Sequence, residues 1–148
     1  SGFVCTHKII YEESGSNYCG RCGTFIAINK FQIVVYPSES KEDMSPFTAH
    51  CLNLDIIADG EDVDGTILLL FELIELHFKT CKEYDANPLS NASAEYYEKF
   101  WKAKPLSEEL LSYIFPLPKF INKEQLEIRV VEQSRFFRKI LFRMKREK

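Results

Sequence analysis

Two closely spaced cysteines near the start of this 148-residue chain constrain its fold more than any other feature. Cys19 and Cys22 are separated by two residues and followed by Gly23. In such a turn, two thiolates and nearby backbone N–H groups converge on one tetrahedral ion, typically zinc. Two thiolates supply only half of a site, so two further ligands are needed. We therefore predict a zinc knuckle over residues 3–23, with a structural, fully coordinated Cys3His site made by Cys5, His7, Cys19 and Cys22.

Two alternatives to this ligand set stay open. His50, next to Cys51, is a rival source of the fourth ligand. Otherwise the thiols form a redox pair beside an exposed His7, although no thioredoxin-like βαβ pattern surrounds them. Five cysteines are an odd number, which is unusual for a secreted disulfide framework, so we expect an intracellular chain with reduced thiols. Cys51 and Cys81 fit a core as small hydrophobic side chains.

Basic residues gather at the carboxyl end, although the whole chain has a net charge of −3. Residues 135–148 carry a net charge of +6, while residues 1–134 carry −9. Such asymmetry is typical of a local anion-binding surface. The alternative is a solvated terminal tail that binds nothing.

The pattern of apolar and turn-forming residues predicts several strands and three helical segments. Aromatic residues make up 14% of the chain, which fits a β-rich fold. A strand, an Asp/Gly-rich turn and a second strand indicate a hairpin over residues 48–71. Ser107, followed by two glutamates, marks a helix start. The predicted strands cover residues 25–36, 48–57, 66–71, 124–132 and 136–144, and the predicted helices cover residues 72–83, 94–102 and 105–115.

A cluster of acidic residues falls on the expected hairpin turn. It comprises Asp55, Asp59, Glu61, Asp62 and Asp64. The spacing lacks the ligand positions and the closing glutamate of an EF-hand. We therefore expect a solvated hairpin tip rather than a calcium site.

The order of these motifs resembles the C-terminal OB-fold domain of the replication protein A large subunit and its zinc-ribbon relatives. The matching pieces are residues 5–10, 18–23, 52–59 and 65–71, and the strand pair after Asn122. The resemblance implies a mainly β fold: a single OB-fold domain over residues 1–148, with a five-stranded barrel, a zinc ribbon, and a loop and helical insertion (84–118) between the third and fourth strands. The family's first barrel strand is then either residues 28–36 or lies upstream of residue 1.

We expect a binding domain rather than an enzyme. The chain has no Gly-x-Ser-x-Gly, no Walker loop and no His-Glu-x-x-His motif, and no membrane-spanning run. A groove for single-stranded nucleic acid needs cations and flat rings. With the resemblance, this predicts a nuclear single-stranded DNA-binding domain in DNA replication, repair, recombination or telomere maintenance, without a small-molecule substrate. The expected contacts are Lys30, Phe31, Arg135, Phe137, Arg138, Lys139, Arg143, Lys145 and Arg146.

The same fold also suggests a scaffold that mainly binds protein partners. In this alternative, the domain belongs to a multi-subunit DNA-maintenance complex of telomeric or shieldin-like type. Tyr97 and Trp101 lie in the predicted insertion, and these residue types are favoured at interface hot spots. They are therefore our candidate partner anchors, although they equally suit packing of the insertion onto the barrel.

Overall fold

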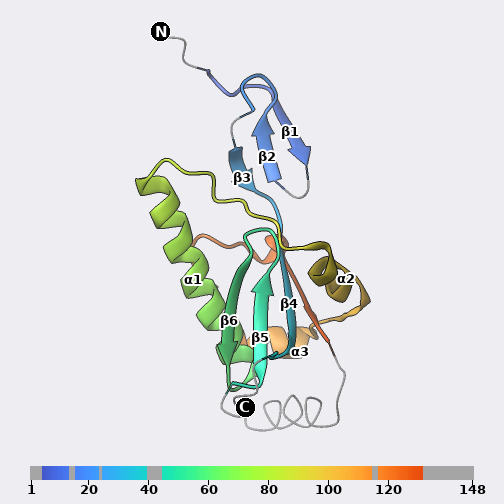
Figure 1. Cartoon of the computed structure of the whole chain (residues 1–148). Helices are drawn as coiled ribbons and strands as arrows, with labels where there is room; N and C mark the ends of the chain where they lie inside the picture. The colour runs from blue at the N-terminus through green and yellow to red at the C-terminus, as the bar shows by residue number, and fades with distance from the viewer. Residues whose placement is uncertain (1–4, 14–15, 24, 40–44, 115–116, 132–148) are drawn as a thin grey trace.

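Two separate β-sheets organise the chain in the computed structural model, which describes residues 5–13, 16–23, 25–39, 45–114 and 117–131 (Figure 1). The smaller sheet is antiparallel, in the order β1 (Ile10–Glu13), β2 (Ser16–Cys19), β3 (Phe25–Ile28). The larger sheet has the order β6 (Ile56–Gly60), β5 (Phe47–Cys51), β4 (Phe31–Pro37), β8 (Leu126–Val130), β7 (Lys104–Pro105). We call residues 5–28 the ribbon and residues 29–131 the body. The ribbon projects from one end of the body (Figure 1).

The larger sheet is mixed and open. Its central strand β4 runs antiparallel to β5 and parallel to β8, so that Ile33 lies between Cys51 and Ile128. The edge strands β6 and β7 pair only with their inner neighbours, and no closed barrel exists among the described residues. The expected mainly β OB-fold barrel is therefore not found in the described ranges, where the chain forms a mixed α/β fold with two sheets. The physical reason is that helices, rather than the sheet itself, cover the apolar faces of the strands.

One face of the larger sheet packs against the long helix α1 (Val63–Glu83). Ile33 and Val35 point to this face, because alternate residues of a strand point to opposite sides. Ile67, Leu70 and Ile74 return from α1 at helical spacing and are fully buried. This is the larger of the two cores of the body.

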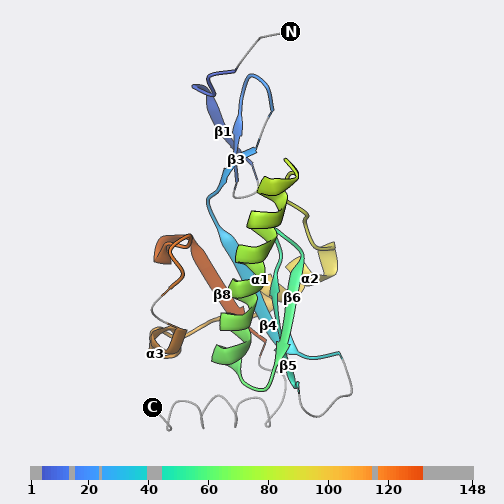
Figure 2. The same ribbon diagram turned by 90° about the vertical axis from the view of Figure 1, so that its left-hand side faces the viewer.

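The opposite face of the sheet packs against the shorter helix α2 (Ala94–Lys102). Val34 and Tyr36 of β4 point to this side, where they meet Leu52 and the fully buried Phe100. Figure 2 shows α1 and α2 on opposite sides of the sheet. The body therefore has three layers, and residues 33–36 of β4 are all buried because both faces of this strand are covered.

The segment predicted as the third strand is helical. Residues 66–71 lie inside α1, and the predicted helix over residues 72–83 is its second half. Asp62 begins the helix, since its side chain accepts a hydrogen bond from the backbone N–H of Gly65 at 2.9 Å. The hairpin is formed instead by β5 and β6, with residues 52–55 as its turn. A five-residue apolar run fits a buried strand and a buried helix equally well, and here packing against the larger sheet selects the helix that Asp62 begins.

Other predicted elements are confirmed, divided or shortened. The helix over residues 94–102 is α2, and the strand predicted over 124–132 is β8, entered through a 3₁₀ turn at Lys123–Gln125. The strand predicted over 25–36 is divided between β3 and β4, which belong to different sheets. The predicted helix over 105–115 is reduced to α3 (Glu108–Leu111) and a 3₁₀ turn at Ser112–Ile114. The strand predicted over residues 136–144 lies outside the described residues.

Candidate metal centre and the adjoining hollow

The ribbon brings two short stretches of chain together. Cys19 ends β2 and lies opposite Ile10 of β1, so the residues before β1 lie beside the turn after β2. The backbone N–H of Gly20 donates to the carbonyl of Ile9 at 2.7 Å, which fixes this approach. A Cβ added at Gly20 would lie 2.9 Å from the side chain of Ile9, so glycine keeps the contact open. Antiparallel pairing thus supplies two ligands from each side.

Left-handed backbone shapes both ligand turns. Gly23 has φ of +75° and donates its N–H to the carbonyl of Cys19 at 2.9 Å, closing the knuckle turn. His7 has φ of +53°, which is uncommon for a residue with a side chain. Both turns therefore fold back toward the same point, at a cost in backbone energy at His7.

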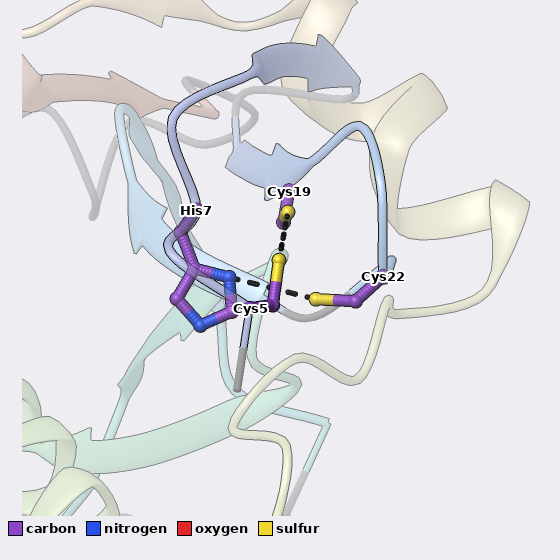
Figure 3. A group of neighbouring side chains, drawn as sticks. All are labelled: Cys5, His7, Cys19 and Cys22. Atoms are coloured by element: carbon purple, nitrogen blue, oxygen red, sulfur yellow. Dashed lines mark hydrogen bonds between the residues drawn. The ribbon is translucent and has the colours of Figure 1, made fainter. Parts of the chain in front are cut away.

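The four predicted ligands form one cluster (Figure 3). Their ligand atoms all lie within 4.8 Å of one another. The Sγ atoms of Cys5 and Cys19 are 3.4 Å apart, and Cys22 Sγ lies 3.5 Å from His7 Nδ1. Around a tetrahedral zinc, two thiolates are separated by about 3.8 Å, and a thiolate and an imidazole nitrogen by about 3.6 Å. The donor set therefore fits a metal ion such as zinc, and the predicted grouping is confirmed.

The thiols of Cys5 and Cys19, which are in contact, have pKa values that are shifted in opposite directions. Backbone N–H groups of Cys22 and Arg21 lower the pKa of Cys19 to about 7, because they stabilise its thiolate. At Cys5 a backbone hydrogen bond at His7 lowers the pKa, but the neighbouring Cys19 thiol and burial outweigh it, so the net pKa is raised. Of these two thiols, Cys19 therefore loses its proton at the lower pH. With four protein ligands, a tetrahedral ion has no open position for a substrate.

The rival ligand His50 lies elsewhere, fully buried in the body. Its Nε2–H donates to the carboxylate of Asp55 at 2.7 Å. Its Nδ1 then accepts from the hydroxyl of Tyr36 at 3.2 Å, because a neutral imidazole has one donor and one acceptor. Desolvation lowers the pKa of His50. The alternative in which His50 completes the metal site is therefore wrong, since this side chain braces β4, β5 and the hairpin turn.

The acidic cluster also divides, and only part of it behaves as a solvated tip. Asp55 binds His50, Asp59 accepts from the hydroxyl of Thr48, and Asp62 caps α1. Burial and the nearby carboxylate of Asp62 raise the pKa of Asp64. The expectation of one solvated hairpin tip is corrected, because these carboxylates have separate structural partners.

The predicted contact residues differ widely in exposure. Phe31 is 1% exposed and packs edge-on against Phe78 of α1, with ring centroids 6.4 Å apart. Its ring is a core side chain, so its predicted role in stacking is corrected. Lys30 is exposed and Trp101 is 59% exposed. The remaining predicted contacts lie outside the described residues: Arg135, Phe137, Arg138, Lys139, Arg143, Lys145 and Arg146.

A hollow of about 570 Å³ lies between the ribbon, the start of β4 and the α2 region. Lys30, Tyr97 and Trp101 were predicted on two different surfaces, and in the structure they line this one hollow. The hydroxyl oxygen of Tyr97 also lies 3.2 Å from the carbonyl oxygen of Leu52, so this side chain packs α2 onto the body. Three further polar residues of the lining were not predicted, because no local motif links them: Glu12, Gln32 and Asn91.

Comparisons of this chain with protein-family models, with curated proteins and with solved structures each find no match. Among the helices of the described ranges, none combines the length and the apolarity that crossing a bilayer requires. The function must therefore be argued from the metal cluster and the hollow themselves.

Proposed function

We propose that this chain is a zinc-stabilised, non-catalytic domain that binds single-stranded DNA in a nuclear complex for DNA replication, repair, recombination or telomere maintenance. The observation that carries the proposal is the hollow, in which the cation of Lys30 and the exposed ring of Trp101 lie together. Single-strand binding needs this pairing of cations along the phosphates and flat rings for the bases. The basic terminal segment (residues 135–148) would supply the larger part of the phosphate contacts.

In this proposal the zinc ion is structural. Cys5, His7, Cys19 and Cys22 would hold it, and four protein ligands leave no position for an activated water. The chemistry that the bound ion supplies is a cross-link between the segment before β1 (residues 5–9) and the turn after β2. This supports a role for the ribbon in shaping a binding surface rather than in turnover.

A second candidate is a scaffold that binds a protein partner, which one specific observation favours. Apolar side chains lie exposed on α1 at Leu68 and Leu69 and, about two turns further along, at Leu76. Leu69 and Leu76 are seven residues apart, and Leu76 is 60% exposed. Exposed apolar strips of this kind are typical of interaction sites.

Fluorescence anisotropy with a labelled oligothymidine of about a dozen nucleotides tests the first function. We expect binding that weakens by at least about a hundredfold between about 50 mM and about 200 mM salt, and weaker binding to duplex DNA. No binding at low salt, or binding that ignores salt, would contradict the proposal.

Leu76→Glu is the matched variant for the scaffold function. It adds a charge on the far side of the body from the hollow, so oligothymidine binding should stay within about twofold of the unaltered chain. Co-purification of a partner that is lost in Leu76→Glu, together with no DNA binding by the unaltered chain, would favour the scaffold instead.

A further inference from the structure

The hollow has the size and composition of a site for one nucleotide. Its volume of about 570 Å³ lies in the range of small-ligand sites, about 300–1,000 Å³. The ribbon contributes Glu12 to the hollow. Lys30 immediately precedes β4, and Gln32 lies in β4. Asn91 precedes α2, and Trp101 lies in α2. One carboxylate, one ammonium group, two amides and one indole therefore face the same space.

Trp101 is exposed but held in a defined position. Its ring packs edge-on against the fully buried Phe100, with centroids 5.1 Å apart and planes at 79°. The guanidinium carbon of Arg129 lies 5.1 Å from the Trp101 ring centroid, and Arg129 is itself paired with Glu127 at 3.1 Å. The indole is thus fixed by neighbours rather than by burial, which leaves ring surface for a ligand. Stacking of a base on such a ring is sequence-tolerant.

Two amide side chains line the hollow. In each of them the oxygen already accepts a hydrogen bond, so the NH₂ group is the part that can donate to a ligand. Gln32 Oε1 accepts from Asn53 at 3.1 Å, and Asn91 Oδ1 accepts from the hydroxyl of Tyr97 at 2.9 Å. Within the described part of the chain, neither amide nitrogen has a hydrogen-bond acceptor. The bonded oxygens orient both side chains, so their NH₂ groups are ready to donate to carbonyl oxygens such as O2 and O4 of thymine.

The two charged groups of the hollow are suited to different parts of a nucleotide. Lys30 is an exposed ammonium group that suits a phosphate. Glu12 accepts a hydrogen bond from the side-chain amide of Asn29 at 3.1 Å, and that same amide nitrogen donates to Asn17 at 2.7 Å. A carboxylate held in this way repels phosphate but accepts a base N–H. The hollow therefore distinguishes a base end from a phosphate end.

We propose that this hollow binds one thymine-type nucleotide of a single strand, with the base stacked on Trp101 and the phosphate at Lys30. Gln32 and Asn91 donate to the base carbonyls, and Glu12 accepts from its ring N–H. The proposal rests on the proposed function and names the place where the strand meets the body.

Trp101 is the single tryptophan of the chain, so its fluorescence reports on this hollow alone. The experiment titrates oligothymidine and follows both Trp101 emission and the anisotropy of the labelled strand. We expect quenching and anisotropy to give the same dissociation constant. Gln32→Ala should weaken binding by about tenfold, and Lys30→Glu should weaken binding and reduce the slope of log affinity against log salt by at least about 1.

The matched control is Lys119→Glu, an exposed lysine next to Phe120, which packs against α1 on the opposite side of the sheet. It makes the same charge change as Lys30→Glu and should leave quenching unaltered, apart from a small uniform loss of affinity. Circular dichroism melting of every variant checks that each one folds.

The outcomes separate the two proposals. Binding by anisotropy without quenching, or with equal effects of Lys30→Glu and Lys119→Glu, overturns the nucleotide site while single-strand binding stands. No binding by either signal overturns the proposed function and the site together. Unaltered DNA binding by Trp101→Ala, with loss of a co-purifying protein, would assign the hollow to a protein partner and also overturn the nucleotide site.

Discussion

The ribbon and the body of this chain are stabilised in different ways. In the ribbon, Ile9 and Ile10 are 66% and 53% exposed, and few of its described side chains are buried. In the body, Phe47, Phe71 and Phe100 are essentially inaccessible, and helices cover both faces of the sheet. The body therefore gains its stability from burial of apolar surface. The ribbon has little apolar surface to bury, so we expect its stability to depend on metal binding by its four clustered side chains.

One short chain thus combines an apolar core with a small sheet whose four clustered side chains could hold a metal ion. Among the described residues, the ribbon and the body make few contacts with each other, chiefly where β3 leads into β4. Asn29 donates to two ribbon residues, and Gln125 of the body donates to the carbonyl of Ile28 at 3.0 Å. The hollow lies at this junction, so loss of ribbon structure should alter the hollow without unfolding the body.

The largest expected effect is that of removing the metal. A strong chelator, or Cys22→Ser, should abolish the ordered structure of the ribbon, because metal binding to small zinc domains contributes about 10 kcal/mol or more. Two-dimensional amide NMR spectra should lose dispersed signals for residues 5–28 and keep those of the body. Cys81→Ser, a half-buried cysteine outside the cluster, is the control. Equal loss of dispersed amide signals from the ribbon and the body would show that the two regions form one cooperative unit.

The next effect in size is a cavity in the body. Phe100→Ala removes a fully buried ring beneath α2 and should lower the free energy of unfolding of the body by about 3–5 kcal/mol. Urea unfolding followed by Trp101 fluorescence measures it. Zinc content of the folded protein should stay at one ion per chain. Loss of zinc from the folded Phe100→Ala variant would show that metal binding by the ribbon depends on the core of the body.

Removal of the α1 cap should have a smaller effect. Asp62→Ala leaves the N–H of Gly65 without its acceptor, and we expect a loss of about 1 kcal/mol in the same urea experiment. The neighbouring Glu61→Ala changes an exposed carboxylate and should stay within about 0.5 kcal/mol. Equal losses in the two variants would argue against the cap.

Acidification should act on the body through His50, with the smallest effect. Burial holds the folded pKa of His50 below its ordinary value of 6.5, so the unfolded chain binds the proton more readily. This contribution to stability is fully present above about pH 6.5 and is lost as the pH falls toward the lowered pKa. The stability advantage of the unaltered chain over His50→Gln should therefore narrow below pH 6.5, as measured by urea unfolding. A constant advantage from pH 7.5 to about 5 would contradict this.

Part of this molecule follows from local sequence. The metal cluster was predictable because Cys19 and Cys22 lie in one turn, and because a single strand pairing brings Cys5 and His7 beside them. The α2 helix and strand β8 were predictable from their periodicity. In each case, the physical cause lies within one short stretch of the chain.

Other features were decided only by the tertiary structure. The run at residues 66–71 satisfies the apolar pattern of either element, and packing against β4 and β5 makes it a helix. Phe31 follows an exposed lysine, yet the alternation of β4 directs its ring into the core. The hollow joins residues 12, 30, 32, 91 and 101, which no local pattern links. Short-range geometry determined the ligands, whereas burial and long-range contacts, which depend on the whole chain, determined the open sheet and the site beside it.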